Sequence, residues 1–332
     1  MNKNQKIFLT SIILITTITL SALTYTITTT PKQTDKLQIV TTIYPLTYLT
    51  QQIGGDHVEI TQLIPDNTDI HNWEPTIAHI VAAEDANIIF YNGANADHWM
   101  TQTILPALSN SNKRTTIETT ANITLTPNTE HNHNHEHNDH NHNDEHDDHN
   151  QSIYDPHTWI SPHIVKQQAQ TIYNTLITID PPNQNHYTQN WQTLKQQLEQ
   201  LDNAYLNGLA NTKRKNIFVS HEAYGYLAEQ YGFTQQGVIG LSADHQPSIT
   251  TIRNIVDEMK KQQTHTIYFD PLYSNNYIQT IKNEIQTQTG QNITILKLYL
   301  MLGPMDNLDY LEQIQTNLTN LQTGLEATEN NT

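Results

Sequence analysis

Cysteine is absent from this chain of 332 residues. Its absence excludes disulfide bonds, metal sites built on thiolates, and attachment of a lipid to an N-terminal cysteine. Any transition metal that this protein binds must therefore be held by nitrogen and oxygen atoms.

Charge is also scarce, and basic charge most of all. Charged residues make up 15% of the chain, 16 residues are Lys or Arg, and the formal net charge is −17. Binding to nucleic acid depends on clustered Lys and Arg that neutralise phosphates, so we expect no nucleic-acid partner. The acidic balance weakly favours cationic partners but does not name a ligand.

Signatures of catalysis are missing as well. The chain has no HExxH motif, no nucleophile elbow and no glycine-rich phosphate-binding loop. No assembled catalytic group is visible, and we do not expect an enzyme.

The N-terminus has the pattern of an export segment. Lys3 and Lys6 precede an uncharged run from Ile7 to about Ile27, followed by the polar stretch TTTPKQTDK. Residues 1–30 are therefore interpreted as a signal peptide or an N-terminal membrane anchor, because a run of about 20 residues can also span a bilayer and no clear cleavage site follows. Either alternative places the rest of the chain outside the cytoplasm.

Beyond this segment, apolar runs with strand character alternate with stretches of helical periodicity. Strands are predicted within 37–46, 58–65, 87–93, 216–222, 233–240, 265–270 and 293–302, and helices within 47–54, 75–86, 163–179, 223–232, 248–262, 276–290 and 310–325. Such alternation is typical of parallel sheets covered by helices. The predicted class is α/β, with two lobes that each contain a parallel sheet flanked by helices, and with a metal cleft between them.

A long amphipathic helix separates the two series of elements. Apolar residues recur at spacings of three or four from Tyr187 to Leu209, with no interior proline, which predicts a stiff linking helix over residues 182–209. The N-terminal lobe is placed at 37–181 and the C-terminal lobe at 210–328.

Residues 130–150 form a low-complexity run of His, Asn, Asp and Glu without any apolar residue. Such a segment has nothing to bury and is expected to stay disordered without metal. Neighbouring imidazoles offer many combinations of two or three ligands, which favours weak auxiliary zinc sites, although a neutral repeat expansion is the alternative. The eight auxiliary candidates are His131, His133, His135, His137, His140, His142, His146 and His149.

Three further histidines, His71, His157 and His221, each follow a predicted strand or lie in the loop beyond one. Ligands of open parallel sheets bind beyond the carboxyl ends of the strands, so loops from two facing lobes could bring these imidazoles together. Three imidazoles with an open fourth position would make a zinc-type site, although an isolated loop histidine is usually just exposed.

Other polar residues near these histidines are weaker candidates. Loop acids can orient the second nitrogen of an imidazole, but they more commonly face solvent or cap a helix. The acids in question are Asp69, Glu74, Asp155 and Glu222, and the histidines that we expect to be structural are His79, His98 and His163.

Several motifs in order resemble the extracytoplasmic solute-binding proteins of zinc and manganese ABC transporters, and most closely the zinc-uptake subfamily with a His-rich loop. The resemblance runs from about Leu37 to Leu325, and its carriers are IVTTIYPL, IPDNTDIHNWEPT, ANIIFYNGANADHWM, DPHTWISP, SHEAYGYLAEQYGF, IGLSADHQPS and TIYFDP. It implies that His71, His157 and His221 are the primary metal ligands.

The same resemblance bears on the choice of metal. Manganese members tend to have a carboxylate where this chain has His221, and imidazole suits zinc better than manganese, so Zn²⁺ is the expected cargo. The family often has an acidic residue in the last strand, where this sequence has Tyr299 at what corresponds to that place. A neutral phenol is a poor ligand, so we do not assign Tyr299, and water or a loop side chain would complete the site.

The resemblance implies capture of zinc outside the cytoplasmic membrane and delivery to the permease of an ABC importer with its ATPase. The protein is expected to be a monomer, with membrane contact through its N-terminal segment if that segment is uncleaved. The alternatives are a manganese-binding importer component, a surface metal buffer or adhesin, and, less favoured, a zinc hydrolase, because three histidines and a water also describe catalytic zinc sites.

Overall fold

The structure is a computed structural model that describes residues 36–109, 114–127, 154–241 and 247–328. Leu37–Thr332 form one compact unit, which is separate from Met1–Lys36. The predicted export segment at 1–30 and the His-rich run at 130–150 lie outside the described residues. Within the described ranges, no helix combines the length and the apolar character needed to cross a membrane.

The first half of this unit is built on a sheet of four parallel strands in the order β2-β1-β3-β4. Isoleucines on neighbouring strands pair here, with Ile39 opposite both Ile60 and Ile88, because β-branched side chains pack well on a pleated surface. The strands are β1 (Leu37–Thr41), β2 (Val58–Gln62), β3 (Ile88–Tyr91) and β4 (Thr115–Glu118), and the helices are α2 (Tyr44–Gly54), α3 (Ile77–Asp85), α4 (Leu105–Ala107) and α5 (Pro162–Ile179).

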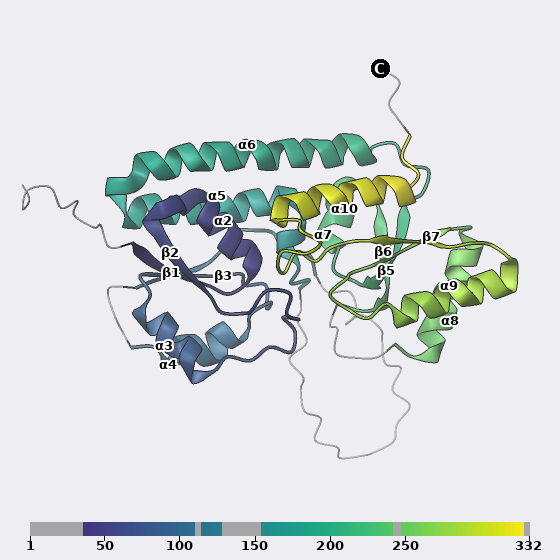
Figure 1. The fold of residues 1–332 in the computed structure, drawn as a ribbon, viewed down its shortest axis with the longest axis horizontal. Coiled ribbons are helices and arrows are strands. Elements are labelled where there is room, and N and C mark those ends of the chain that lie inside the picture. Colours follow the sequence, from purple (N-terminus) through teal and green to yellow (C-terminus); the bar gives the residue numbers. More distant parts are fainter. Residues whose placement is uncertain (1–35, 110–113, 128–153, 242–246, 329–332) are drawn as a thin grey trace, which may run out of the picture. The chain divides into compact units, whose positions relative to one another are not determined.

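The second half repeats the layout with four parallel strands in the order β6-β5-β7-β8. Both sheets therefore have the same strand order, and Figure 1 shows them side by side, the first to the left and the second to the right. The strands are β5 (Asn216–His221), β6 (Thr234–Ile239), β7 (Thr266–Phe269) and β8 (Thr294–Lys297), and the helices are α7 (Gly225–Tyr231), α8 (Ile249–Lys261), α9 (Asn276–Thr289) and α10 (Tyr310–Gly324). The prediction of two parallel α/β lobes is confirmed.

Helix α6 (Gln184–Leu209) runs between the two halves and packs on helices of both (Figure 1). Its partners are α2 and α5 from the first half and α7 and α10 from the second. Its buried face contributes Trp191, Leu198 and Tyr205 to a hydrophobic core that is continuous through both halves. A second, smaller core lies between the second sheet and helices α8 and α9. The limits predicted for the lobes, 37–181 and 210–328, remain predictions, as does a linker at 182–209.

Several elements differ from the expectations. The strand predicted over 37–46 ends at Thr41, and α2 begins at Tyr44 with Pro45 in its first turn, a position that suits proline. Strand β4 and helix α4 were not predicted, because both are short and TTIE contains a single apolar residue.

The last strand ends at Lys297 and not at residue 302. Beyond it, side chains replace the ladder: the Tyr299 amide donates to Asn317, and the Leu300 amide donates to Asp270.

Candidate metal centre

His71 lies in the loop between β2 and α3, in the first half of the chain. The Asp69 carboxylate accepts the backbone amide of His71 at 3.0 Å, which fixes the turn that carries the imidazole. Two residues further on, the Trp73 ring packs on Trp99 with ring centroids 4.5 Å apart. The loop is thus tied to the core on one side, while the His71 side chain stays partly exposed.

His157 lies just before α5, in a segment that is buried almost completely. A single oxygen, Oδ1 of Asp155, accepts the backbone amide of His157 at 2.9 Å and lies 2.8 Å from its Nδ1. His157 and Asp155 are only 1% and 3% exposed, so this contact is shielded from water. Orientation of a ligating imidazole through its other nitrogen is the arrangement that metal sites use to select the tautomer.

His221 is the last residue of β5, at the carboxyl end of a central strand of the second sheet. Its Nε2 lies 3.0 Å from the carbonyl oxygen of Leu241, and its ring contacts the ring of Tyr273 edge-on at 5.4 Å. Its buried Nδ1 has no hydrogen-bond partner among the residues that the structure describes. A buried nitrogen without a hydrogen-bond partner at this position is suited to bind a cation.

The three imidazoles converge although 150 positions separate the first from the last. One ligand atom from each of His71, His157 and His221 lies within 4.8 Å of the other two, and the ring centroids are 5.0 to 5.4 Å apart. The Nε2 atoms of His71 and His157 are 3.3 Å apart. Two nitrogens bound at about 2.0–2.1 Å to one tetrahedral zinc ion would be separated by about 3.3–3.4 Å, so this spacing suits a zinc ion.

Burial sets the protonation of the centre. Exclusion of water raises the pKa of Asp155 to about 7 and lowers the pKa of His157 to about 3. Burial also lowers the pKa of His221 well below its usual value, with smaller contributions from His157 and His71. All three shifts disfavour charge in the centre, so both buried imidazoles are neutral and can offer an electron pair to a metal.

The remaining candidates lie elsewhere or have other partners. Glu222 accepts the Gly237 amide at 2.6 Å, and Glu74 is exposed. His79 accepts the Thr76 amide and caps α3, and His163 lies 3.5 Å from Asp202. The Tyr299 hydroxyl donates to Asp306 at 2.6 Å.

Two neighbours of the centre were missed from the sequence, the Leu241 carbonyl and the Tyr273 ring. A backbone carbonyl has no signal in a sequence. Tyr273 follows the FDP motif at the end of β7, and the common position of β5 and β7 in one sheet is the signal that would have placed it near His221.

Known zinc-uptake proteins are similar to this chain in sequence and in fold. A sequence model of the family described as "Zinc-uptake complex component A periplasmic", ZnuA, matches residues 39–324. The high-affinity zinc uptake system protein ZnuA of Bacillus subtilis (strain 168) is 32% identical over 258 residues, which are 77% of each chain.

Two further matches concern a streptococcal protein, AdcA. The zinc-binding lipoprotein AdcA of Streptococcus pneumoniae (strain ATCC BAA-255 / R6) is 30% identical over 296 residues, 88% of this chain but only 56% of that protein. The chain thus spans little more than half of AdcA. The crystal structure of the Zn(II)-bound ZnuA-like domain of S. pneumoniae AdcA superposes with a TM-score of 0.71 at 27% identity, covering 88% of this chain and 99% of that one.

The family match covers both sheets and the helix between them, and it includes all three histidines. The chain therefore belongs to the ZnuA family of periplasmic zinc-uptake components.

Proposed function

We propose that this protein captures zinc outside the cytoplasmic membrane and delivers it to the permease of an ABC importer. The observation that carries the proposal is the convergence of His71, His157 and His221, with ligand atoms within 4.8 Å of one another. Zinc is the cargo, and the protein performs no reaction on it.

The donor set supports zinc over manganese. The group consists of three imidazoles and, among the described residues, includes no carboxylate. Imidazole nitrogen suits zinc, whereas oxygen donors suit manganese. Water or a loop side chain completes the tetrahedron.

The role of each residue follows from its contacts. His71, His157 and His221 donate nitrogen electron pairs to the ion. The Asp155 carboxylate accepts a hydrogen bond from Nδ1 of His157. Nε2 of His157, which faces His71, then carries the electron pair for the ion. A bound divalent cation favours the ionised carboxylate, so zinc binding should lower the pKa of Asp155, which burial raises to about 7.

Family membership supports a proposal for the location and the partners. We infer that the protein works in the periplasm or at the outer face of the membrane, exported by its N-terminal segment, with the permease and its ATPase as partners. The eight histidines of residues 130–150 would add weak zinc sites without forming the tight one.

Competition titration of the full chain against a zinc-chelating dye tests the proposal. Each of His71→Ala, His157→Ala and His221→Ala should weaken the tight site by more than the 10–100-fold loss that is typical for residues outside the ligand set. His163→Ala is the matched control, because His163 is a partly exposed histidine paired with Asp202. A variant lacking residues 130–150 should bind fewer ions and keep the tight one.

Tight zinc binding that survives all three substitutions would overturn the assignment of the ligands. Loss of the tight site in the folded variant without residues 130–150 would instead assign that site to the His-rich run.

A further inference from the structure

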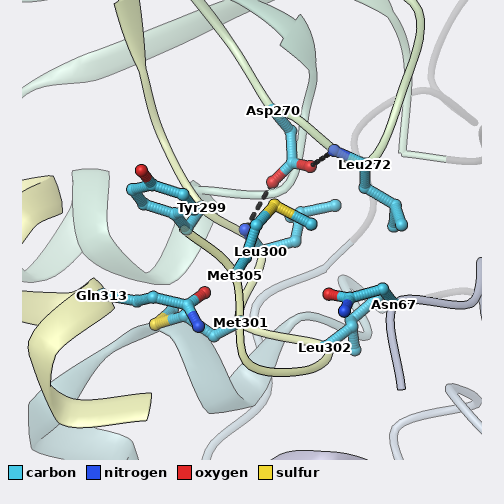
Figure 2. Close-up of a pocket in the computed structure, with 9 residues that line it drawn as sticks. All are labelled: Asn67, Asp270, Leu272, Tyr299, Leu300, Met301, Leu302, Met305 and Gln313. Carbon is cyan, nitrogen blue, oxygen red and sulfur yellow. Dashed lines mark hydrogen bonds between the residues drawn. The ribbon is translucent and has the colours of Figure 1, made fainter. Parts of the chain in front are cut away.

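Residues 299–305, which follow β8, bond the loops that bear His71 and His157 directly and reach His221 through Asp270. We call them the bridging segment. Figure 2 shows five of them, Tyr299, Leu300, Met301, Leu302 and Met305, beside Asn67 and Asp270. These residues line a cavity of about 10 Å³. This volume is at the lower limit for a single water molecule, so the segment is closely packed.

Asp270 joins the bridging segment to the loop that supports His221. One carboxylate oxygen accepts the Leu300 amide, and the other accepts the Leu272 amide at 2.5 Å (Figure 2). The Leu272 turn carries the Tyr273 ring that lies against His221. The Asp270 amide itself donates to the side chain of Ser220, the residue before His221.

The other face of the segment reaches the His157 loop. The Leu300 carbonyl accepts the indole Nε1 of Trp159 at 2.8 Å, and the Trp159 ring lies 5.4 Å from the ring of His157. One peptide position, Leu300, thus connects Asp270 in the second half to the loop of His157 in the first.

The third connection reaches the His71 loop through Asn67. The Asn67 amide donates to the Leu302 carbonyl at 2.8 Å, and its side chain donates to the Pro304 carbonyl at 3.0 Å. A Cβ atom on Gly303 would lie 2.7 Å from the Asn67 nitrogen, so the two loops approach each other as closely as a glycine permits.

Backbone strain collects at the same place. Met301 has φ of +57°, which is uncommon for a residue with a long side chain. This conformation turns the chain between Leu300, which faces Asp270, and Leu302, which faces Asn67. Strained backbone persists only where its surroundings hold it, and here hydrogen bonds on both sides do so.

We propose that Asp270 is a positioning residue for zinc capture, whose carboxylate fixes the bridging segment and thereby the spacing of the three histidine-bearing loops. The proposal rests on the proposed function. Metal sites tolerate deviations of about 0.2 Å in ligand distance, so a small shift of one loop is enough to lower affinity. Burial at 3% exposure, which raises the pKa of Asp270 to about 7, is consistent with a carboxyl group kept in place for its contacts.

The test compares the full-length wild type with Asp270→Asn, Asp306→Asn and Asn67→Gly. Asp270→Asn keeps the size of the side chain but cannot accept both amides, and it should weaken zinc binding about 10-fold or more. Asp306→Asn is the matched control: the same change at an exposed acid close by, whose side chain bonds Lys297 and Tyr299, should alter affinity by no more than about twofold. In Asn67→Gly, the glycine tolerates the positive φ of position 67, and only the side-chain bond to Pro304 is lost. This variant should weaken zinc binding less than Asp270→Asn does.

A second readout separates positioning from simple destabilisation. With less than one Co²⁺ per protein, so that the tight site fills first, the visible spectrum reports coordination geometry. It should change in Asp270→Asn and stay constant in Asp306→Asn. Wild-type affinity and spectrum in a folded Asp270→Asn would overturn the proposal, and so would equal losses in both acid variants.

If Asp270→Asn does not fold, Asn67→Gly decides: it keeps the backbone bond to Leu302 and loses the side-chain bond to Pro304, and an unchanged affinity would overturn the control of loop spacing by the bridging segment. Failure of the proposed function would look different, since the wild type itself would then lack a tight site that depends on its histidines.

Discussion

Asp155 contacts His157 twice, through the backbone amide and through the ring nitrogen. Because Asn offers one acceptor oxygen and one donor group, Asp155→Asn loses the charge and can favour the wrong tautomer of His157. We expect zinc affinity to fall about 10–100-fold, measured by dye competition. Asp257→Asn, at an exposed acid on α8, is the control and should bind as the wild type does. Equal affinities in the two variants would contradict an orienting role for Asp155.

A second buried acid, Asp97, gives the ion-free protein a distinctive pH dependence. Its carboxylate accepts the Thr42 hydroxyl and the amides of Asn92 and Gly93, yet burial raises its pKa to about 6. The folded state therefore holds this proton more tightly than the unfolded state does. The associated stabilisation is complete below about pH 4 and is lost as the pH rises through about 6, by about 3 kcal/mol in all.

Denaturant unfolding of the wild type and of Asp97→Asn at about pH 4 and pH 7 measures this effect, because the comparison cancels the contribution of every other group. The free energy of unfolding of the wild type should fall relative to that of the variant as the pH rises. A difference that stays constant or grows would contradict the raised pKa of Asp97.

At the scale of elements, periodicity was a good guide to helices. A helix was predicted within 182–209, and α6 runs from Gln184 to Leu209, because its apolar residues recur every three or four positions; its role as a linker stays a prediction. For the metal centre, the sequence pattern predicted only that three histidines follow strands and could converge. The geometry around them depends on backbone carbonyls and on hydrogen bonds between residues far apart in the sequence, such as the bond from the Leu300 amide to Asp270. Local sequence patterns do not reveal such contacts.

The end of the last predicted strand shows the same limit. Residues 293–302 read as one apolar strand, yet β8 ends at Lys297 because the amides beyond it are taken by Asp270 and Asn317. Tertiary hydrogen bonds thus override a local preference for strand.

The buried face of α6 can be tested against its own exposed face. Leu198 is fully buried and Leu206 is 43% exposed on the same helix. Leu198→Ala should lower the free energy of unfolding by about 2–5 kcal/mol, because it leaves a cavity between helices, whereas Leu206→Ala should lower it by less than about 1 kcal/mol. Chemical denaturation of both variants provides the measurement, and similar losses would show that the packing of α6 is misassigned.

For the whole molecule, the continuous core is the dominant feature. Residues from both sheets, among them Ile39 and Val219, belong to one hydrophobic cluster that includes the buried face of α6. Wide separation of the halves would expose this apolar surface to water, at a free-energy cost of about 25 cal/mol per Å². Loading and release of zinc are therefore expected to proceed by small shifts of the histidine loops and not by a wide hinge opening.

Unfolding experiments check the same feature. We expect one cooperative transition for the ion-free protein when fluorescence and circular dichroism are compared. A free zinc concentration of about 100 times the dissociation constant should raise the free energy of unfolding by about 2.7 kcal/mol. Two separate transitions, one for each half, would contradict a shared core.

The bond from Trp159 to Leu300 joins positions 141 residues apart, and the Tyr310 hydroxyl bonds the Trp159 carbonyl across 151 residues. All three histidines thus precede in the sequence the residues Leu300 and Tyr310, which hold their loops together. A nascent chain that ends before Leu300 and Tyr310 carries its ligands without the contacts that hold their loops together. We therefore expect tight zinc binding only in a molecule whose C-terminal helix has docked.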